Sequence, residues 1–219
     1  LQVRIPPAYL DQTIKDWNLQ KCKPAATPFS AKAKFGEELP EVDAITHSRY
    51  RRAVGRMLWM VAARPDVAYA IKELSRKCSR PTQLDVIGLK RCLKYLSGTK
   101  DYVFNLTCED AKGRTKALEV HTDSNWSYPK STSGCHIVWN GTILMTTSRT
   151  QSVPALSSAE AEIIAANDAG KEGIFLQNVL EEATGQKIQI ELYCDASAAI
   201  CFAKRQGLGR VRHLQLRFL

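Results

Sequence analysis

The hydrophobic and polar positions follow different periods in the two halves of the chain. In the first half, apolar residues recur at helical spacing within 50–63 and 84–97, with basic residues between them. A further helix is predicted from Arg64-Pro65 to about residue 79, and a short one near 9–17, while the prolines in 1–48 otherwise indicate extended chain. The first half is therefore predicted to be mostly helical.

The second half has the alternation that is typical of β-strands. Strands are predicted over 116–122, 134–139, 142–148 and 188–194. Asn140-Gly141 separates the second strand from the third, and it favours a type I′ hairpin because both residues tolerate the positive φ angles of this turn. The second and third strands should therefore pair antiparallel.

Two helices alternate with these strands. Ser157-x-x-Glu160 has the form of a capping box, and helical spacing continues from it to Gly185, which predicts the longest helix of the chain. An Ala-rich helix follows Asp195 and extends to about residue 205. A strand that returns after a helix usually lies parallel to its predecessor through a right-handed crossover, so the fourth strand should lie beside the first. The predicted fold class is α/β, with a mixed sheet and flanking helices after a mostly helical first segment.

The positive charge of the chain is concentrated in the first half. The formal net charge is +9; residues 1–116 carry 22 basic and 12 acidic residues, whereas residues 117–219 carry 9 and 10. A polyanion such as a nucleic acid is the ordinary partner of such a segment, because the bound phosphates release condensed counterions. Solvated Lys and Arg side chains without a partner are the alternative interpretation.

The composition argues against several classes of protein. An apolar content of 44% is enough to bury the core of one large or two small domains. The chain has no run of roughly 18 apolar residues and no signal-peptide pattern, so we expect an intracellular protein. Its 7 cysteines are odd in number and scattered, which argues against a disulfide framework or a zinc site and favours reduced thiols.

Three acidic residues form a candidate metal site. Asp123 and Asp195 follow the first and fourth strands, and the carboxyl ends of parallel neighbours are the usual place for ligands. Glu162 lies in the predicted opening turn of the intervening helix, which can bring its carboxylate to the same edge. Three carboxylates repel one another unless a divalent cation neutralises them, and Mg²⁺ prefers such oxygen ligands. Two ions would suit displacement at a phosphodiester.

A purely structural interpretation of the same acids is open as well. Asp195 could cap the helix that begins at Ala196, and Glu162 could interact with the positive end of its helix dipole. Asp123 could simply begin a turn. Spacing alone does not decide between this interpretation and the metal site.

The chain resembles the Copia-type (Pseudoviridae) LTR retrotransposon Pol polyproteins at the junction of reverse transcriptase and RNase H. The resemblance covers nearly the whole chain, and seven segments carry it in the order of the family. They are Tyr50-Arg-Arg-Ala-Val-Gly-Arg-Met-Leu-Trp-Met, Ala63-Arg-Pro-Asp-Val-Ala-Tyr, Leu93-Lys-Tyr-Leu-Ser-Gly-Thr, His121-Thr-Asp-Ser-Asn-Trp, Ser131-Thr-Ser-Gly-Cys, Ala155-Leu-Ser-Ser-Ala-Glu-Ala-Glu and Leu192-Tyr-Cys-Asp.

The resemblance implies an RNase H-like domain over 115–219 and a reverse transcriptase thumb and connection segment over 1–114. It implies hydrolysis of the RNA strand of RNA–DNA hybrids with two Mg²⁺ (or Mn²⁺) ions bound by Asp123, Glu162 and Asp195. Glu162 is preferred to Glu160, because an apolar run similar to the family's follows Glu162 while Glu160 fits the capping box.

The resemblance also implies partners and a place in the cell. The partners are RNA–DNA hybrid and other nucleic acid, held in part by the basic first half, and the upstream polymerase part of the same polyprotein, with no membrane. The compartment is the cytoplasm, in a retrotransposon particle, with the nucleus as a second location.

The chain departs from the family pattern near its end. Arg212-His213-Leu214-Gln215 corresponds to the family block that carries a fourth acid, so an amide replaces that carboxylate, and no Asp or Glu follows Asp195. The final strand and helix of the fold are also expected to be missing. The alternative is therefore a catalytically weakened or inactive nucleic-acid-binding remnant. An integrase or transposase is disfavoured, because it needs a glutamate in the acid-free segment 196–219.

Overall fold

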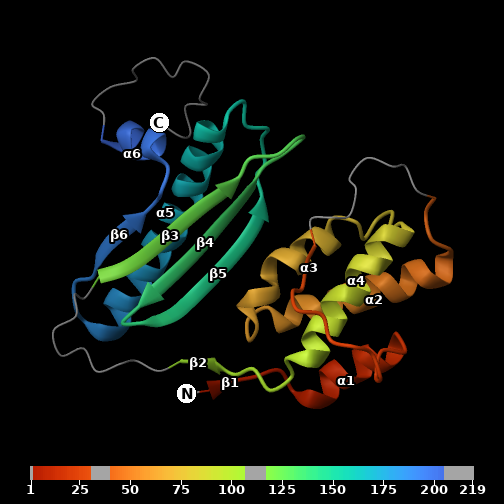
Figure 1. The fold of residues 1–219 in the computed structure, drawn as a ribbon. Helices are drawn as coiled ribbons and strands as arrows, with labels where there is room; N and C mark the ends of the chain where they lie inside the picture. Colours follow the sequence, from red (N-terminus) through yellow and green to blue (C-terminus); the bar gives the residue numbers. More distant parts are fainter. Residues whose placement is uncertain (1, 31–39, 107–116, 205–219) are drawn as a thin grey trace. The chain divides into compact units, whose positions relative to one another are not determined.

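The chain forms two compact units, Leu1–Asn105 and Leu106–Leu219, whose helices and strands are drawn in Figure 1. Each unit has a hydrophobic core of its own. The computed structural model describes residues 2–30, 40–106 and 117–204. The boundary predicted at 114/115 lies outside these described residues. The change from helical to strand period in the sequence thus corresponds to a change of structural unit.

Unit 1 is built from helices and one small sheet. A short antiparallel pair joins β1 to β2, which bracket the unit in sequence. Its helices form where the sequence predicted helical spacing. The elements are β1 (Gln2–Val3), α1 (Pro7–Asp16), α2 (Ala44–Met60), the 3₁₀ helix η1 (Pro65–Val67), α3 (Ala68–Ser75), α4 (Gln83–Gly98) and β2 (Phe104–Asn105).

Helix α2 begins earlier than the predicted start at residue 50. Asp43 lies before the helix in an extended conformation, and its Oδ1 accepts hydrogen bonds from the backbone N–H groups of Ile45 (2.9 Å) and Thr46 (3.0 Å). This N-cap satisfies donors that the first turn leaves without an intrahelical partner. The added residues 44–49 precede Tyr50 in the helix. Tyr50 is fully buried, and its hydroxyl donates a hydrogen bond to the carbonyl oxygen of Leu74 at 2.8 Å.

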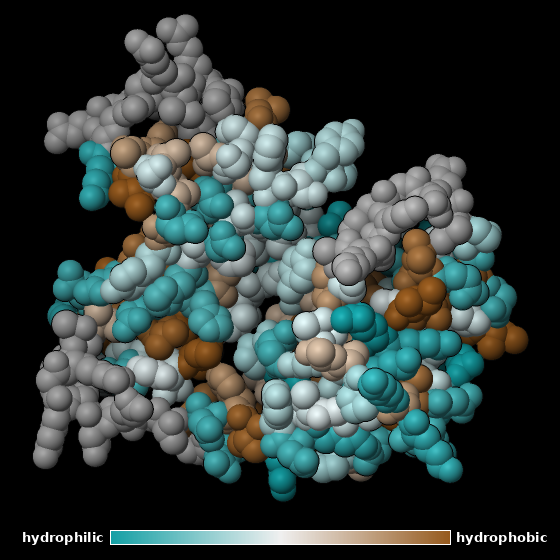
Figure 2. All heavy atoms as spheres, viewed as in Figure 1, coloured by the Kyte–Doolittle hydropathy of each residue, from teal (hydrophilic) through white to brown (hydrophobic). Residues whose placement is uncertain are grey.

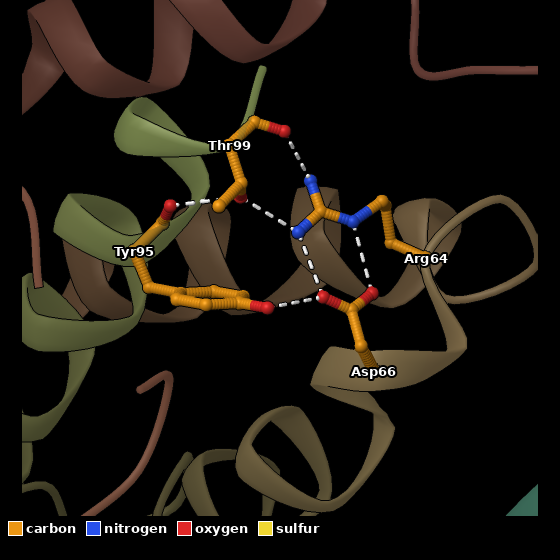
Figure 3. A network of polar contacts seen from close by, with 4 residues as sticks. All are labelled: Arg64, Asp66, Tyr95 and Thr99. Atoms are coloured by element: carbon orange, nitrogen blue, oxygen red, sulfur yellow. Dashed lines mark hydrogen bonds and ion pairs between the residues drawn. The ribbon is translucent and has the colours of Figure 1, made fainter. Parts of the chain in front are cut away.

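A buried arginine joins the end of α2 to the end of α4 (Figure 3). The Arg64 side chain is 4% exposed. Its guanidinium donates two hydrogen bonds to the carboxylate of Asp66 (2.9 and 2.7 Å) and two to Thr99, at the carbonyl oxygen (2.9 Å) and at Oγ1 (2.7 Å). The Tyr95 hydroxyl donates to the same carboxylate at 2.7 Å. Because the guanidinium is planar, its N–H donors point in fixed directions, and the acceptors of Asp66 and Thr99 lie along them.

The charge of Asp66 is stabilised by this network. Burial alone would raise the pKa of Asp66, but hydrogen bonds from Arg64 and Tyr95 outweigh it and hold this pKa below its ordinary value. The network therefore contributes stability above the ordinary pKa of an aspartate and loses it as the pH falls through the lowered value.

We expect Arg64→Lys to lower the free energy of unfolding of unit 1 by about 1–3 kcal/mol, because an ammonium group cannot reproduce the paired bonds to Asp66 and Thr99. Arg80→Lys is the matched control. Arg80 pairs with Glu41 at the surface, where its side chain is 79% exposed, so its replacement should change stability by less than about 0.5 kcal/mol. Urea unfolding followed by circular dichroism measures the free energy of unfolding of both variants. Equal changes in the two variants would show that the buried contacts of Arg64 do not stabilise the unit more than a surface ion pair does.

Unit 2 is a four-stranded mixed sheet in the order β5-β4-β3-β6. Strand β3 pairs antiparallel with β4 and parallel with β6, as the crossover argument predicted. Asn140 (φ 49°) and Gly141 (φ 76°) form the turn between β4 and β5, which confirms the hairpin prediction. The elements are β3 (Ala117–Asn125), β4 (Thr132–Trp139), β5 (Thr142–Thr150), α5 (Ser158–Thr184), β6 (Gln189–Tyr193) and α6 (Ser197–Ala203).

Helix α5 covers one face of this sheet (Figure 1). The strands direct Leu118, Val120 and Ile137 into the core, where each is fully buried. A methyl group added at Gly173 would lie 2.8 Å from Cγ2 of Val120, closer than real side chains approach. Gly173 therefore allows α5 to lie directly on β3.

We expect Gly173→Ala to destabilise unit 2 by about 1–3 kcal/mol, because Val120 is β-branched and enclosed and cannot move away cheaply. Gly170→Ala, one turn earlier in the same helix, is the matched control: nothing lies within 4 Å of the added methyl group, so helix propensity should raise stability by about 0.5–1 kcal/mol. Thermal unfolding of the two variants measures the difference. The same sign of change in both would contradict the proposed close packing.

The surface of both units is mainly hydrophilic on the face seen in Figure 2, with apolar side chains scattered over it. Among the described helices, none has the length and the apolar character needed to cross a bilayer. The larger exposed apolar side chains include Trp59 (84% exposed) in unit 1 and Tyr128 (96% exposed) in unit 2. The helical spacing of apolar residues predicted a buried face only in part, because Leu58 in α2 (50% exposed) and Ile174 in α5 (54% exposed) lie at the surface.

Candidate acidic site at the edge of the sheet

Two of the predicted acids lie at the same edge of the sheet. Asp123 lies near the end of β3 and is exposed, and the strand continues past it to Asn125. Asp195 follows the end of β6 by two residues and is also exposed. Because β3 and β6 are parallel and His121 is the register partner of Tyr193, the two aspartates occupy equivalent places after that pair. Parallel pairing thus brings together residues that are far apart in the sequence.

Glu162 reaches this edge from α5. Its Oε1 accepts hydrogen bonds from the Oγ of Ser124 (2.8 Å) and from the backbone N–H of the same residue (3.3 Å). That N–H also donates to Oδ1 of Asp123 at 2.8 Å. The other oxygen of Glu162, Oε2, is buried and has no hydrogen-bond partner among the described residues. A buried carboxylate oxygen without a donor is costly, so this atom is suited to a cation.

The position of Glu162 in its helix differs from the prediction. Helix α5 begins at Ser158, so Glu162 lies at the start of the second turn, and Glu160 is the acid of the first turn. The capping box is only half formed: the Oγ of Ser157 accepts from the N–H of Glu160 (3.2 Å), but the Glu160 carboxylate accepts from Leu156 (2.7 Å), one residue before the cap. Interaction with the helix terminus therefore belongs to Glu160 rather than Glu162.

The charges of both aspartates act on Glu162. Burial raises the pKa of Glu162, the negative charges of Asp123 and Asp195 raise it further, and the hydrogen bonds from Ser124 oppose the shift without cancelling it. Asp195 does not cap the following helix, because α6 has Ala196 as its N-cap and no side-chain hydrogen bond there. The structural explanation for Asp195 therefore fails, and the roles predicted for the three acids stay a prediction.

A cysteine that the sequence analysis did not select lies in the same place. One oxygen each of Glu162 and Asp195 and the Sγ of Cys194 all lie within 4.8 Å of one another. Burial raises the pKa of the Cys194 thiol, the Ala196 backbone opposes this, and the charges of Glu162, Asp195 and Asp123 add to it. The thiol is thus disfavoured as a thiolate. The only signal in the sequence was its place between the end of a strand and Asp195.

The carboxylates of this group suit a hard divalent cation, whereas the Cys194 sulfur beside them is a soft donor. Mg²⁺ and Mn²⁺ prefer carboxylate oxygens, and the unpartnered Oε2 of Glu162 lies where the negative charges of Asp123 and Asp195 act on it. The position predicted to replace a fourth acid, Gln215, lies outside the described residues. The described acids therefore fit the predicted Mg²⁺ or Mn²⁺ chemistry.

We expect Glu162→Gln to raise the free energy of unfolding of the metal-free protein at neutral pH by about 0.5–2 kcal/mol. The raised pKa means that wild-type stability falls as the pH rises through the pKa of Glu162, and glutamine removes this loss, so the gain should grow with pH. Denaturant unfolding in EDTA over a pH series measures it.

Glu160→Gln is the matched control for Glu162→Gln, because it also neutralises a glutamate of α5. It should lower stability by about 0.5–1 kcal/mol, since the carboxylate that caps Leu156 near the helix N-terminus loses its charge. If both variants were destabilised to the same extent, repulsion among the three acids would not be the dominant effect at Glu162.

Comparison with known proteins identifies relatives that extend beyond this chain. No protein-family model and no solved structure matches it. The retrovirus-related Pol polyprotein from transposon TNT 1-94 of Nicotiana tabacum is 29% identical over 221 residues, which cover 96% of this chain and 16% of the relative. The Pol polyprotein from transposon RE2 of Arabidopsis thaliana is 30% identical over 212 residues, or 91% of this chain and 14% of the relative. The chain thus spans about one seventh of these proteins.

A third relative matches a smaller part of the chain. The secreted RxLR effector protein 161 of Plasmopara viticola is 35% identical over 132 residues, which cover 58% of this chain and 90% of that protein. The Pol matches, in contrast, run over nearly the whole chain and so include both units. Over nearly its whole length the chain is therefore homologous to one part of the Pol polyproteins of Copia-type retrotransposons.

Proposed function

We propose that unit 2 is the RNase H-type endonuclease portion of a retrotransposon reverse transcriptase and that it hydrolyses the RNA strand of RNA–DNA hybrids. The observation that carries the proposal is that acids from three separate elements lie at one edge of the sheet: Glu162 and Asp195 have oxygens within 4.8 Å of each other, and Asp123 shares the Ser124 N–H with Glu162. The charges of Asp123 from β3 and Asp195 after β6 act on Glu162 from α5, and Glu162 keeps an oxygen without a donor among the described residues. An arrangement so unfavourable for stability is typical of a functional site.

The topology is consistent with an RNase H-like domain. Three antiparallel strands in meander order are followed by a long helix and by a strand that returns parallel to the first. The helix covers one face, and the acids lie at the carboxyl edge of the parallel pair, the usual position for ligands in such sheets. The comparisons add support, because relatives that match nearly the whole chain are Pol polyproteins.

In this proposal Asp123, Glu162 and Asp195 hold Mg²⁺ or Mn²⁺. Bound divalent cations supply Lewis acidity and neutralise the charge that develops when water displaces an oxygen at the scissile phosphodiester. Ser124 orients Glu162 by donating two hydrogen bonds to its Oε1, which leaves Oε2 for the cation. Thr122, next to Asp123 in β3, is buried on the same face of the strand as Val120.

The proposed substrate and partners follow from the family and from the chemistry of the site. A hybrid duplex is recognised by its A-form shape and by the 2′-hydroxyl groups of its RNA strand. Because the relatives are several times longer than this chain, the upstream polymerase part of the same polyprotein is the proposed protein partner. The proposed location is the cytoplasm, in a retrotransposon particle, with the nucleus as a second site of action.

A second candidate function is a nucleic-acid-binding remnant with weak or no cleavage. The observation that favours it is Gln215, an amide at the position where the family resemblance expects a fourth carboxylate. An amide cannot contribute the negative charge that helps to hold a second cation. The two candidates therefore share the substrate and differ in the rate of hydrolysis.

We expect hydrolysis of a labelled RNA–DNA hybrid in Mg²⁺ to fall at least about 100-fold in Asp123→Asn and in Asp195→Asn, because each removes a charged ligand. Ser124→Ala should reduce it about tenfold by loosening Glu162. The matched control is Asp168→Asn, which neutralises an exposed acid that pairs with Lys171 on the same α5 and should leave the rate unchanged.

Two results would decide between the candidates. If the wild-type chain cleaves and Asp123→Asn cleaves equally well, the proposed acids are not the catalytic group. If neither cleaves while both bind the hybrid with the same affinity in EDTA, the remnant function holds in place of the nuclease.

A further inference from the structure

A small cationic cavity lies in unit 1, between the end of α1 and the middle of α2. Its volume is about 190 Å³. It is lined by Asp16 and Trp17 at the end of α1 and by Arg49, Arg52 and Ala53 from α2. Arg49 and Arg52 are exposed, while Trp17 and Ala53 are buried beneath them. The cavity thus has an apolar floor and a basic rim.

The cations of the rim are held by contacts that leave their charge in place. The guanidinium of Arg49 lies 5.1 Å above the ring of Trp17, and the amine of Lys90, from α4, lies 5.9 Å from the same ring. Arg49 also donates a hydrogen bond to the backbone carbonyl oxygen of Asp16. An indole face and a carbonyl oxygen orient a cation, but neither neutralises it. Arg49 is therefore held in position at the rim before any ligand binds.

Cations outnumber the nearby carboxylate. Asp16 forms an ion pair with Arg56 at 2.6 Å. Arg49, Arg52 and Arg56 follow one another at i, i+3 and i+7, so they share one side of α2. In the described part of the chain no ion pair connects Arg49, Arg52 or Lys90 to an acid. The group therefore keeps an excess of positive charge that an anion would relieve.

We propose that this cavity binds a phosphate group of a nucleic-acid backbone, with Arg49 and Arg52 as the principal donors and Lys90 as a further cation. The planar guanidinium presents paired N–H donors that match two oxygens of one phosphate. The row of cations along α2 favours a polymer with regularly repeated negative charges over a single phosphorylated side chain. The site lies in unit 1 and is independent of the hydrolysis proposed for unit 2.

The salt dependence of binding tests the proposal with the full chain. Affinity for a labelled RNA–DNA hybrid is measured in EDTA, so that no cleavage occurs, over a series of salt concentrations. The slope of log K against log salt should fall by about 0.9 for each duplex phosphate contact that is lost. For Arg49→Gln/Arg52→Gln, which removes the contact with one phosphate, we expect a slope smaller by about 0.9 and an affinity about tenfold or more weaker at low salt.

Arg76→Gln/Arg80→Gln is the matched control, since it removes the same charge from the same unit. Arg76 and Arg80 lie outside the cavity and form surface ion pairs with Glu73 and Glu41. This control should keep the wild-type slope. Arg52→Gln alone, which keeps the contacts of Arg49 with Trp17 and Asp16, should lower the slope in the same direction by no more than about 0.9 and excludes misfolding as the cause.

Three outcomes would overturn the proposal. The first is a wild-type slope in Arg49→Gln/Arg52→Gln, and the second is an equal change in the Arg76→Gln/Arg80→Gln control. The third is loss of binding to anionic phospholipid vesicles with no change for the hybrid, which would assign the cavity to a lipid headgroup. Hydrolysis by the wild-type chain is measured separately. If the wild-type chain cleaves the hybrid but Arg49→Gln/Arg52→Gln keeps the wild-type slope, only this inference is rejected. If the wild-type chain does not cleave but the variant shows the expected smaller slope, this inference is supported.

Discussion

The parallel pairing of β3 with β6 is the constraint on which unit 2 depends. It places Asp123 and Asp195 at one edge of the sheet, and α5 brings Glu162 to the same edge because Gly173 allows the helix to lie directly on Val120. The packing that stabilises the unit therefore also creates repulsion among its acids. Burial and these like charges raise the pKa of Glu162, which means that its ionised form is destabilised in the folded protein. The other contacts of the unit must offset this loss of folding free energy.

The sequence predicted the elements and their order because local patterns determine them. Period-two alternation located the strands, Asn140-Gly141 located the hairpin, and Gly185 (φ 65°) ends α5 where its helical spacing ends. The comparison with relatives confirmed the family that the motifs indicated. Boundaries were less accurate: the cap at Asp43 starts α2 before its apolar period begins, because capping depends on one side chain and not on a repeat.

Contacts between distant residues could not be predicted in the same way. Ser124 was part of a quoted motif, yet its bonds to Glu162 depend on how α5 lies over β3. Cys194 was set aside among scattered thiols, although its place before Asp195 brings its sulfur to the acids. Arg64 carries no local signal for burial, since its partners Asp66 and Thr99 come together only when α4 packs against the end of α2. Local patterns thus identified candidate acids, while the geometry around them is a property of packing.

Two arginines of unit 1 show how surroundings separate a structural cation from one that is available to a ligand. Arg64 is almost fully buried, and its donors are used by a carboxylate and by Thr99, so its charge is neutralised and its directions are satisfied. Arg49 is positioned by the indole ring of Trp17 and by the carbonyl oxygen of Asp16. These contacts leave its charge uncompensated, and its side chain is exposed to solvent. Because fixing a side chain in advance lowers the entropy lost on binding, a positioned but uncompensated arginine is a better phosphate ligand than a freely moving one. Net positive charge alone would not distinguish Arg64 from Arg49. The groups that contact each guanidinium do distinguish them, because only Arg64 is paired with a carboxylate.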